Sequence, residues 1–417
     1  SNSGTATGFG AIDWQTSDIK TSNFTAVAGK GYFVNTTGGA ITVNLPAGSA
    51  GSIIALVDYA GTWDTNKCTI SANGSEKIQG STDDGTLERD REAVNLIYVD
   101  STQGWVVTSV SDQGITQKAY IVATGGTITT SGDYKIHTFT GDGTFNVTAI
   151  GNAAGGGALT SYVVVAGGGG GGTTNPGGAG GGGGSGGFRE GKASGDPYSA
   201  SPLNAPAGLT VSVQPYTITV GGGGTPNSSP GRHFGGAGDT STFSTISSAG
   251  GGGGGASCSG NPPTAGRPGG SGGGGGFGPG PAAGGGSGNT PPVSPPQGNN
   301  GGAGEDGGTV SAGGGGGAGA AGATAVYPGT PGAGGNGVAS SITGSPVTRA
   351  GGGGGASETQ PAGAGGSGGG GAGRFHASGP GPDAGTANTG GGGGGAYCGT
   401  GGNGGPGVVI IRYKYQN

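Results

Sequence analysis

The sequence predicts an all-β N-terminal module followed by a glycine-rich domain of bundled polyglycine II helices framed by β-strands, with no substantial α-helix. Three observations lead to this fold class. Short runs of β-branched and aromatic residues alternate with Gly, Asn and Asp in the first part of the chain, as in strands joined by turns. Glycine occupies 118 of the 417 positions, much of it in uninterrupted runs. No segment keeps the apolar spacing of a helix for more than a turn or two.

Residues 1–11 are expected to form an N-terminal arm and residues 12–110 a compact β module. In the segment ITVNL, strand alternation places Ile41, Val43 and Leu45 on one face. The expected strands are GYFVN, ITVNL, SIIALVD, KCTISA, VNLIYVD and GWVVTSV. Strands this short would leave sheet edges open in a single copy. We therefore expect the module to serve attachment or trimerisation, in a homotrimer.

The rest of the chain divides into a linker at 111–118, a second β segment at 119–160 and the glycine-rich domain at 161–417. In the last part a unit recurs, which consists of a short strand, a glycine run and a polar insert. The runs include residues 167–172, 180–184, 221–224, 250–255, 272–276, 313–317, 351–355, 368–371 and 390–395. The chain closes on PGVVIIRYKYQN, which has the composition of a strand.

Polyglycine has the largest backbone entropy of any sequence, and it has no side chains that could offset the loss of this entropy. The stabilisation of an ordered run must therefore come from interactions of the backbone itself. Glycine adopts a left-handed extended helix with three residues per turn, whose N–H and C=O groups point outward. Without Cβ atoms such helices can approach closely and exchange hydrogen bonds in several directions. A flexible linker is the alternative. The apolar strands that lead into several runs favour the ordered bundle.

Composition and charge argue against two classes of partner. The chain has 16 basic and 21 acidic residues and a net charge of −5, with no cluster of Lys and Arg among aromatic residues. Nucleic acid is therefore not expected as a partner. No apolar run approaches the roughly 20 residues that span a bilayer, so no membrane insertion is expected either.

The sequence offers little chemistry for catalysis. Its three histidines, His137, His233 and His376, are far apart and show no metal-ligand spacing. We therefore predict no enzymatic activity, no catalytic residues, no cofactor and no metal. Cys258 and Cys398 each lie close to a glycine run, and both a disulfide between them and two free thiols remain open.

The inserts between runs are interpreted as loops at the ends of the bundle, where recognition commonly resides. They occupy residues 185–206, 225–239, 277–300, 325–331 and 374–389. The candidate receptor-binding residues in and beside them are rings and cations: Phe188, Arg189, Tyr198, Arg232, His233, Phe234, Phe277, Tyr327, Arg374, Phe375 and His376. For any single ring the alternative is that it caps the bundle. The similar segments RHF (232–234) and RFH (374–376) suggest equivalent loops, with cations packed on rings.

Several of these segments together resemble a known class of protein. The set is GYFVNTTGGAITVNLPAGSAGSIIALVDYAGTW, VNLIYVDSTQGWVV, DYKIHTFTGDGTFNV, SYVVVAGGGGGG and GGPGVVIIRYKY. It resembles bacteriophage tail-fibre and other virion structural proteins with glycine-rich domains. The resemblance implies a homotrimeric fibre or distal adhesin on the virion, with polyglycine helices packed in a sandwich. Its implied partners are other fibre or baseplate proteins and a host cell-surface protein or glycan, bound outside the cell during attachment.

Two other functions stay open at this point. The first is a purely architectural role as a fibre, neck or decoration protein without receptor contact. The second is an ice-binding or other extracellular adhesive role, since flat arrays of polyglycine helices can present ordered small residues. The glycine runs themselves lack the three-residue period that such a face requires.

Overall fold

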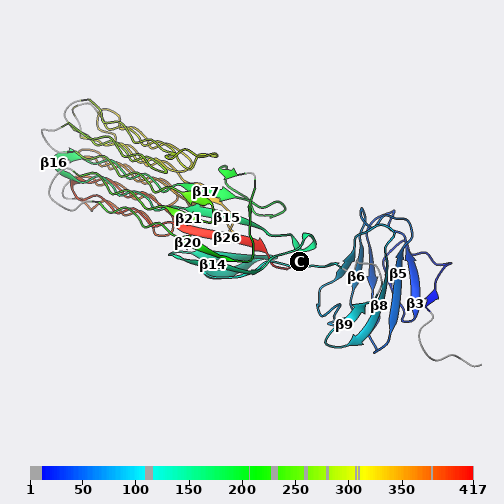
Figure 1. Ribbon diagram of the computed structural model, residues 1–417. Coiled ribbons are helices and arrows are strands. Elements are labelled where there is room, and N and C mark those ends of the chain that lie inside the picture. The colour runs from blue at the N-terminus through cyan, green and yellow to red at the C-terminus, as the bar shows by residue number, and fades with distance from the viewer. Residues whose placement is uncertain are drawn as a thin grey trace, which may run out of the picture. The chain divides into compact units, whose positions relative to one another are not determined.

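The computed structural model describes residues 12–108, 116–205, 207–226, 233–257, 262–278, 281–305, 308, 310–376 and 379–416 (Figure 1). These residues form β-strands and one 3-10 helix, Ala153–Gly155, and none of them is in an α-helix. The predicted fold class is thereby confirmed. The chain divides into two compact units, one of residues up to Ala119 with Gly151–Gly157, and one of Tyr120–Ile150 with Ala158–Asn417. No helix in the described ranges has the length and apolarity needed to cross a membrane.

The first unit is a pair of five-stranded sheets. One sheet has the order β1 (Asp13–Trp14), β3 (Lys30–Val34), β5 (Ile53–Asp58), β8 (Ala93–Asp100) and β9 (Gly104–Val107). The other has the order β10 (Thr116–Gln117), β7 (Gly85–Leu87), β6 (Cys68–Ser71), β4 (Ile41–Asn44) and β2 (Phe24–Thr25). From β1 to β6 the chain alternates between the sheets, and neighbours within each sheet are parallel. The chain therefore coils between two layers and finishes in antiparallel pairs.

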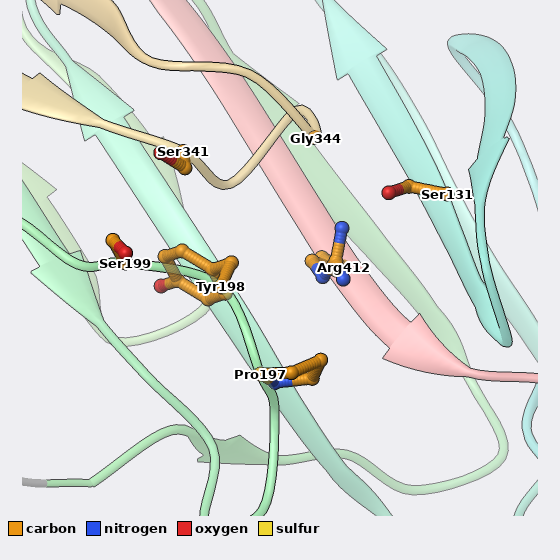
Figure 2. Close-up of a pocket in the computed structure, with 7 residues that line it drawn as sticks. All are labelled: Ser131, Pro197, Tyr198, Ser199, Ser341, Gly344 and Arg412. Carbon is orange, nitrogen blue, oxygen red and sulfur yellow. The ribbon is translucent and has the colours of Figure 1, made fainter.

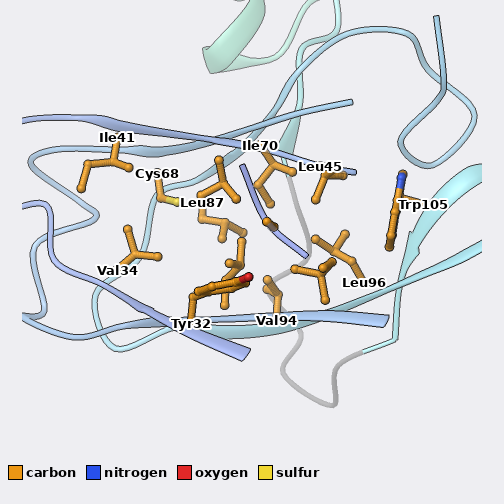
Figure 3. Packing of buried hydrophobic residues seen from close by; sticks show 14 of the residues in the cluster. Tyr32, Val34, Ile41, Leu45, Cys68, Ile70, Leu87, Val94, Leu96 and Trp105 are labelled. Carbon is orange, nitrogen blue, oxygen red and sulfur yellow. The ribbon is translucent and has the colours of Figure 1, made fainter. Parts of the chain in front are cut away.

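The core of this unit lies between the two sheets. Ile41, Val43 and Leu45 are all buried there, which confirms the alternation predicted for ITVNL. Figure 3 shows side chains from both sheets meeting, with the rings of Tyr32 and Trp105 among them. The homotrimer stays a prediction.

The second unit contains two larger sheets and two short strand pairs. The smaller of the two has the order β11 (Val122–Thr124), β14 (Gly143–Ala149), β20 (Pro215–Thr219), β21 (Ser241–Phe243) and β22 (Ile246–Ser248). The other, the central sheet, has the order β12 (Thr127–Ser131), β13 (Tyr134–Phe139), β26 (Val408–Lys414), β15 (Leu159–Val165), β17 (Phe188–Gly191) and β18 (Asn204–Ala205), with β19 (Leu209–Thr210) on β15. The short pairs are β16 (Thr174–Ala179) with β25 (Tyr397–Gly399) and β23 (Val338–Ser340) with β24 (Val347–Arg349).

The sequence places a boundary at residue 160, between the second β segment and the glycine-rich domain, but the structure does not divide the chain there. β14 pairs with β20 and β13 pairs with β26, while β11 and β12 extend the same two sheets. Residues 120–150 therefore belong to the same unit as the glycine-rich part. Phe145 and Val147 pack with Phe243 and Ile411 in one core between the two larger sheets. The sequence could not show this because the partner of β13 lies at the far end of the chain.

The glycine runs form a hydrogen-bonded bundle of extended rods. In the central rod, residues 167–172, amides three positions apart donate to the same neighbour, at N···O distances of 2.8–3.0 Å. The three acceptor rods are residues 233–239, 401–407 and 180–187. Carbonyl groups of the central rod accept from three more rods, residues 250–255, 221–224 and 390–396. This threefold repeat is that of the polyglycine II helix.

Close packing explains why these positions are glycine. A Cβ atom on Gly169 would collide with the carbonyl oxygen of Gly252, and one on Gly183 with that of Gly169. At the surface of the bundle the requirement relaxes on one side. In the rod of residues 332–337, Gly332 and Gly335 donate inward at 2.9 Å, whereas Ala333 and Asn336 are exposed.

The interpretation of every insert as a loop is therefore wrong in part. Residues 235–239 and 383–386 hydrogen-bond to neighbouring rods, and β17 and β18 lie within the insert at 185–206. The physical reason is that an outer rod needs glycine only at the positions that face its neighbours. A period of three, as in residues 332–337 and 363–367, is enough to place a segment in the bundle.

Candidate binding surface at the loop end of the bundle

The rods run in alternating directions, so the turns between them gather at two ends of the bundle. At the strand end, β15, β17, β23 and β26 pack together through the cluster of Val165, Phe188, Val338 and Val408. At the loop end lie the pair β16–β25 and the turns at Val326–Thr330, Ser357 and Phe375. Figure 1 shows β16 at the end of the bundle that is remote from β15, β20 and β26.

A small apolar cluster closes the loop end. It consists of Ala179, Phe277, Ala312, Ala356 and Tyr397, with Phe277 and Tyr397 buried. Ala179 joins both rings through backbone bridges to Phe277 and Tyr397. These two rings therefore cap the bundle, and Phe277 is not part of an exposed surface.

The turn at Val326–Thr330 presents the most exposed ring among the predicted site residues. Two backbone hydrogen bonds close it, from Val326 N to Thr330 O at 2.9 Å and from Thr330 N to Val326 O at 2.8 Å. The Ser311 hydroxyl donates to Gly329 O at 2.6 Å and fixes the turn to its neighbour. The side chains of Val326 and Tyr327 are 58% and 66% exposed.

A second exposed ring, Phe375, lies on the same set of turns. Ser357 forms backbone bridges to both Ser311 and Phe375, so the two turns are joined through it. Phe375 is 41% exposed, and the adjacent exposed His376 stacks on Tyr397 with ring centroids 6.3 Å apart. We call the four exposed residues Val326, Tyr327, Phe375 and His376 the tip patch.

The remaining candidates at the loop end are partly packed. Thr173 N donates to His233 O at 3.0 Å. The guanidinium of Arg267 lies 4.3 Å from the ring centre of Phe234. The sequence predicts a cation packed on a ring in this segment, and here Arg267, from a different segment, supplies the cation. Arg374 donates to Cys398 O at 3.4 Å. Arg232 and Cys258 lie outside the described residues.

Three predicted site residues lie at the strand end instead. Phe188 is on β17 and only 1% exposed. Arg189 is on the same strand and pairs with Val164 on β15, and Tyr198 is buried in the same cluster as Phe188. They belong to the packing of the central sheet and not to the loop-end surface. Phe188 and Arg189 therefore lie on a strand and not in a loop, whereas Tyr198 lies in the segment that follows β17. Receptor binding by these three residues stays a prediction.

Sequence reasoning missed Val326 and the serines that hold its turn. The dipeptide Pro328-Gly329 is a strong turn signal, and Val326 lies two positions before it, so its place in a turn could have been found from the sequence. Ser311 and Ser357 carry no comparable signal, because their role depends on neighbours that only the packing of rods brings together.

The potential metal ligands of the described residues are scattered. Among them no group of three or more His, Cys, Asp or Glu side chains could hold a metal ion. His137 is fully buried, with Nδ1 at 2.7 Å from Gly125 O and Nε2 at 3.0 Å from the Tyr413 hydroxyl. Burial lowers the pKa of its imidazole, which suits a neutral ring in a core. Cys68 is buried and Cys398 half-buried, and both are free thiols.

Comparison with known families gives one result. Residues 140–414 match the family described as Glycine-rich domain, a stretch that includes the bundle and most of the sheets of the second unit. No curated protein matches the sequence.

Proposed function

Because this chain belongs to the glycine-rich domain family, we propose that it is a structural binding protein of a virion surface, in a tail fibre or similar appendage, and that its loop end attaches to a host cell. The tip patch is the observation that carries this proposal. Exposed rings and apolar side chains on a fixed turn lose little conformational entropy when they bind. Aromatic side chains are also those that most often dominate binding energy at interfaces.

The bundle suits the task of holding such a patch at a distance from the sheets of the second unit. The Gly168 amide donates to one rod at 2.9 Å and the Gly169 amide to another at 2.8 Å, so each rod is tied to several others. Such a support keeps the turns in place without a large apolar core. Several copies in one fibre, or several fibres on a particle, would add weak contacts into durable attachment.

The proposal is tested by attachment of the purified, fluorescently labelled chain to a panel of bacterial cells. The double variant Tyr327→Ser, Phe375→Ser removes both exposed rings of the tip patch. We expect its attachment to fall by about thirtyfold or more, since loss of an anchoring ring costs at least about 2 kcal/mol. The matched control is Tyr59→Ser, because Tyr59 is 47% exposed and lies in the first unit.

The outcomes separate attachment from the architectural alternative. Attachment that survives in the double variant would exclude the tip patch as the binding surface. Failure to attach to any cell in the panel, with the chain folded, would favour a purely architectural role in the appendage.

A second candidate function is binding to an ordered surface such as ice, and one observation favours it. Adjacent outer rods are joined by Ala323 N to Ala333 O and Gly334 N to Ala364 O, both at 2.9 Å. They expose small side chains at every third position, namely Ala321 and Thr324, Ala333 and Asn336, and Ala364 and Ser367. Thermal hysteresis and ice recrystallisation assays test this candidate. Activity that disappears in Ala333→Tyr would support it, and inactive parent protein would reject it.

A further inference from the structure

A cavity of about 320 Å³ opens on the second unit at the strand end, away from the tip patch. Its lining comes from four separate segments: Ser131 at the end of β12, Pro197 to Ser199 after β17, Ser341 and Gly344 between β23 and β24, and Arg412 on β26 (Figure 2). This volume is at the lower end of the range for ligand pockets, about 300–1,000 Å³.

Arg412 anchors the walls of the cavity. It is 3% exposed, and its Nε donates to both carboxylate oxygens of Asp196, at 2.9 and 3.2 Å. Its Nη1 donates to Ile342 O at 3.2 Å, and its guanidinium lies 4.5 Å from the ring centre of Tyr134. One buried side chain thus holds the loop after β17 and the turn after β23, and the site is organised before any ligand arrives.

The two walls are also tied to each other directly. Ser341 N donates to Ser199 O at 2.9 Å, and Gly344 N donates to Ser341 O at 2.8 Å. On the opposite side, a Cβ atom at Gly344 would lie 3.0 Å from the Ser131 hydroxyl, so Ser131 and Gly344 border the same opening.

Polar groups with unused hydrogen-bonding capacity are among the residues that line this cavity. The hydroxyls of Ser131, Ser199 and Ser341, which line the cavity, have no hydrogen-bond partner within the described part of the chain. The same holds for the second terminal nitrogen of Arg412, since only its Nε and Nη1 are paired there. Each hydroxyl can both donate and accept. The exposed ring of Pro197 adds an apolar wall.

The charge balance distinguishes between classes of ligand. The carboxylate of Asp196 neutralises Arg412 at hydrogen-bond distance, so the cavity offers no net charge to an anion. Hydroxyl donors and acceptors beside one apolar wall match a neutral molecule that carries hydroxyls on a carbon ring. We propose that this cavity binds a small neutral polyhydroxylated ligand, one sugar unit of a glycan.

The experiment is a titration of the full chain with the methyl glycosides of glucose, galactose and mannose, followed by backbone amide shifts. Binding should shift the amides of Tyr198, Ser199, Ser341 and Gly344. The double variant Ser199→Ala, Ser341→Ala should raise Kd by about fivefold for each hydroxyl removed, the effect of one hydrogen bond of about 1 kcal/mol. The matched control is Ser247→Ala, because Ser247 is an exposed serine on β22 in the other sheet.

Two further variants make the test specific. Ser131→Leu places a larger apolar group at the opening and should abolish the shifts while thermal unfolding stays that of the parent. Tyr327→Ser should leave the titration unchanged, which separates this site from attachment through the tip patch. The inference is overturned if none of the three glycosides shifts these amides, if the double serine variant binds as the parent does, or if acetate or phosphate binds in place of the sugars.

Discussion

At the residue scale, Glu92 is a buried acid in the first unit that lacks full hydrogen bonding. Its side chain is 7% exposed, and its Oε1 atom has no partner. Burial raises the pKa of this carboxyl from 4.5 to about 7, and the nearby Arg89 offsets only part of that effect. Because the folded-state pKa lies above the unfolded one, the protonated form favours folding. The unit should therefore lose stability as pH rises through about 7.

Replacement of Glu92 by Gln removes this titration. We expect Glu92→Gln to unfold like the parent near pH 4.5 and to be more stable than the parent at pH 9, by up to about 3 kcal/mol. The measurement is urea unfolding followed by tryptophan fluorescence at both pH values. Asp83→Asn is the control, because Asp83 is exposed on the same unit. If the free energy of unfolding differs between Glu92→Gln and the parent by the same amount at both pH values, the carboxyl does not have a raised pKa.

The residues of the candidate site show how far a sequence can be interpreted. Tyr327 follows directly from its Pro-Gly turn, and the structure exposes it. Phe188 and Tyr198 have a similar local sequence setting, yet both are buried at the other end of the bundle. Each rod reverses the direction of the chain, so the end at which an insert emerges depends on every crossing before it. Local composition does not contain that information.

At the scale of elements, the rods depend on the absence of side chains at inward positions. A Cβ atom on Gly183 would meet the carbonyl oxygen of Gly169 in the interior of the bundle. The exposed Gly284 has nothing within 4 Å of the same position. We expect Gly183→Ala to destabilise the second unit by about 3 kcal/mol or more, because backbone must move and hydrogen bonds must lengthen.

The comparison with Gly284→Ala isolates packing from intrinsic glycine effects. Alanine restricts the unfolded chain equally at both positions, so Gly284→Ala should be neutral or slightly stabilising. Thermal unfolding followed by far-ultraviolet circular dichroism measures both. Equal stability of the two variants would show that the interior rods are not in close contact.

Hydrogen exchange tests the bundle amide by amide. The amides of residues 167–172 all donate to neighbouring rods, and most of those in 250–255 and 390–395 do so as well. We expect them to exchange slowly, with opening free energies close to that of global unfolding. The amide of Ala333, which has no backbone partner in the described ranges, should exchange fast in the same sample. Fast exchange throughout the interior rods would show that these segments are a flexible linker and not a hydrogen-bonded bundle.

The elements themselves were predictable to different degrees. The run SYVVVA before Gly167 and the closing VVIIRYKY predicted β15 and β26, because β-branched and aromatic residues favour strands. Rods such as residues 332–337 were not predicted, because alanine and asparagine interrupt the glycines. Their period of three is visible in the sequence only once an outer rod is known to need glycine on its inner sides alone.

At the scale of the whole molecule, the last strand closes the second unit. β26 lies between β13 and β15 in the central sheet. Its side chains alternate between two cores, with Val409 and Ile411 on one face and Val408 and Ile410 on the other. Folding of this unit therefore waits for a segment near the end of the chain, which is a contact of very long sequence separation.

The variant Ile410→Asp tests whether the two units depend on each other. Ile410 is fully buried, and a carboxylate there would lack any partner, so we expect the second unit to lose at least about 4 kcal/mol. All three tryptophans, Trp14, Trp63 and Trp105, lie in the first unit, so their fluorescence follows that unit alone. The tryptophan transition in urea should stay at the parent midpoint, while the circular dichroism of the second unit is lost at lower urea.

Ile128→Asp is the matched control, because Ile128 is 45% exposed on β12 in the same sheet. A tryptophan transition that moves together with the circular dichroism would mean that the two units fold as one.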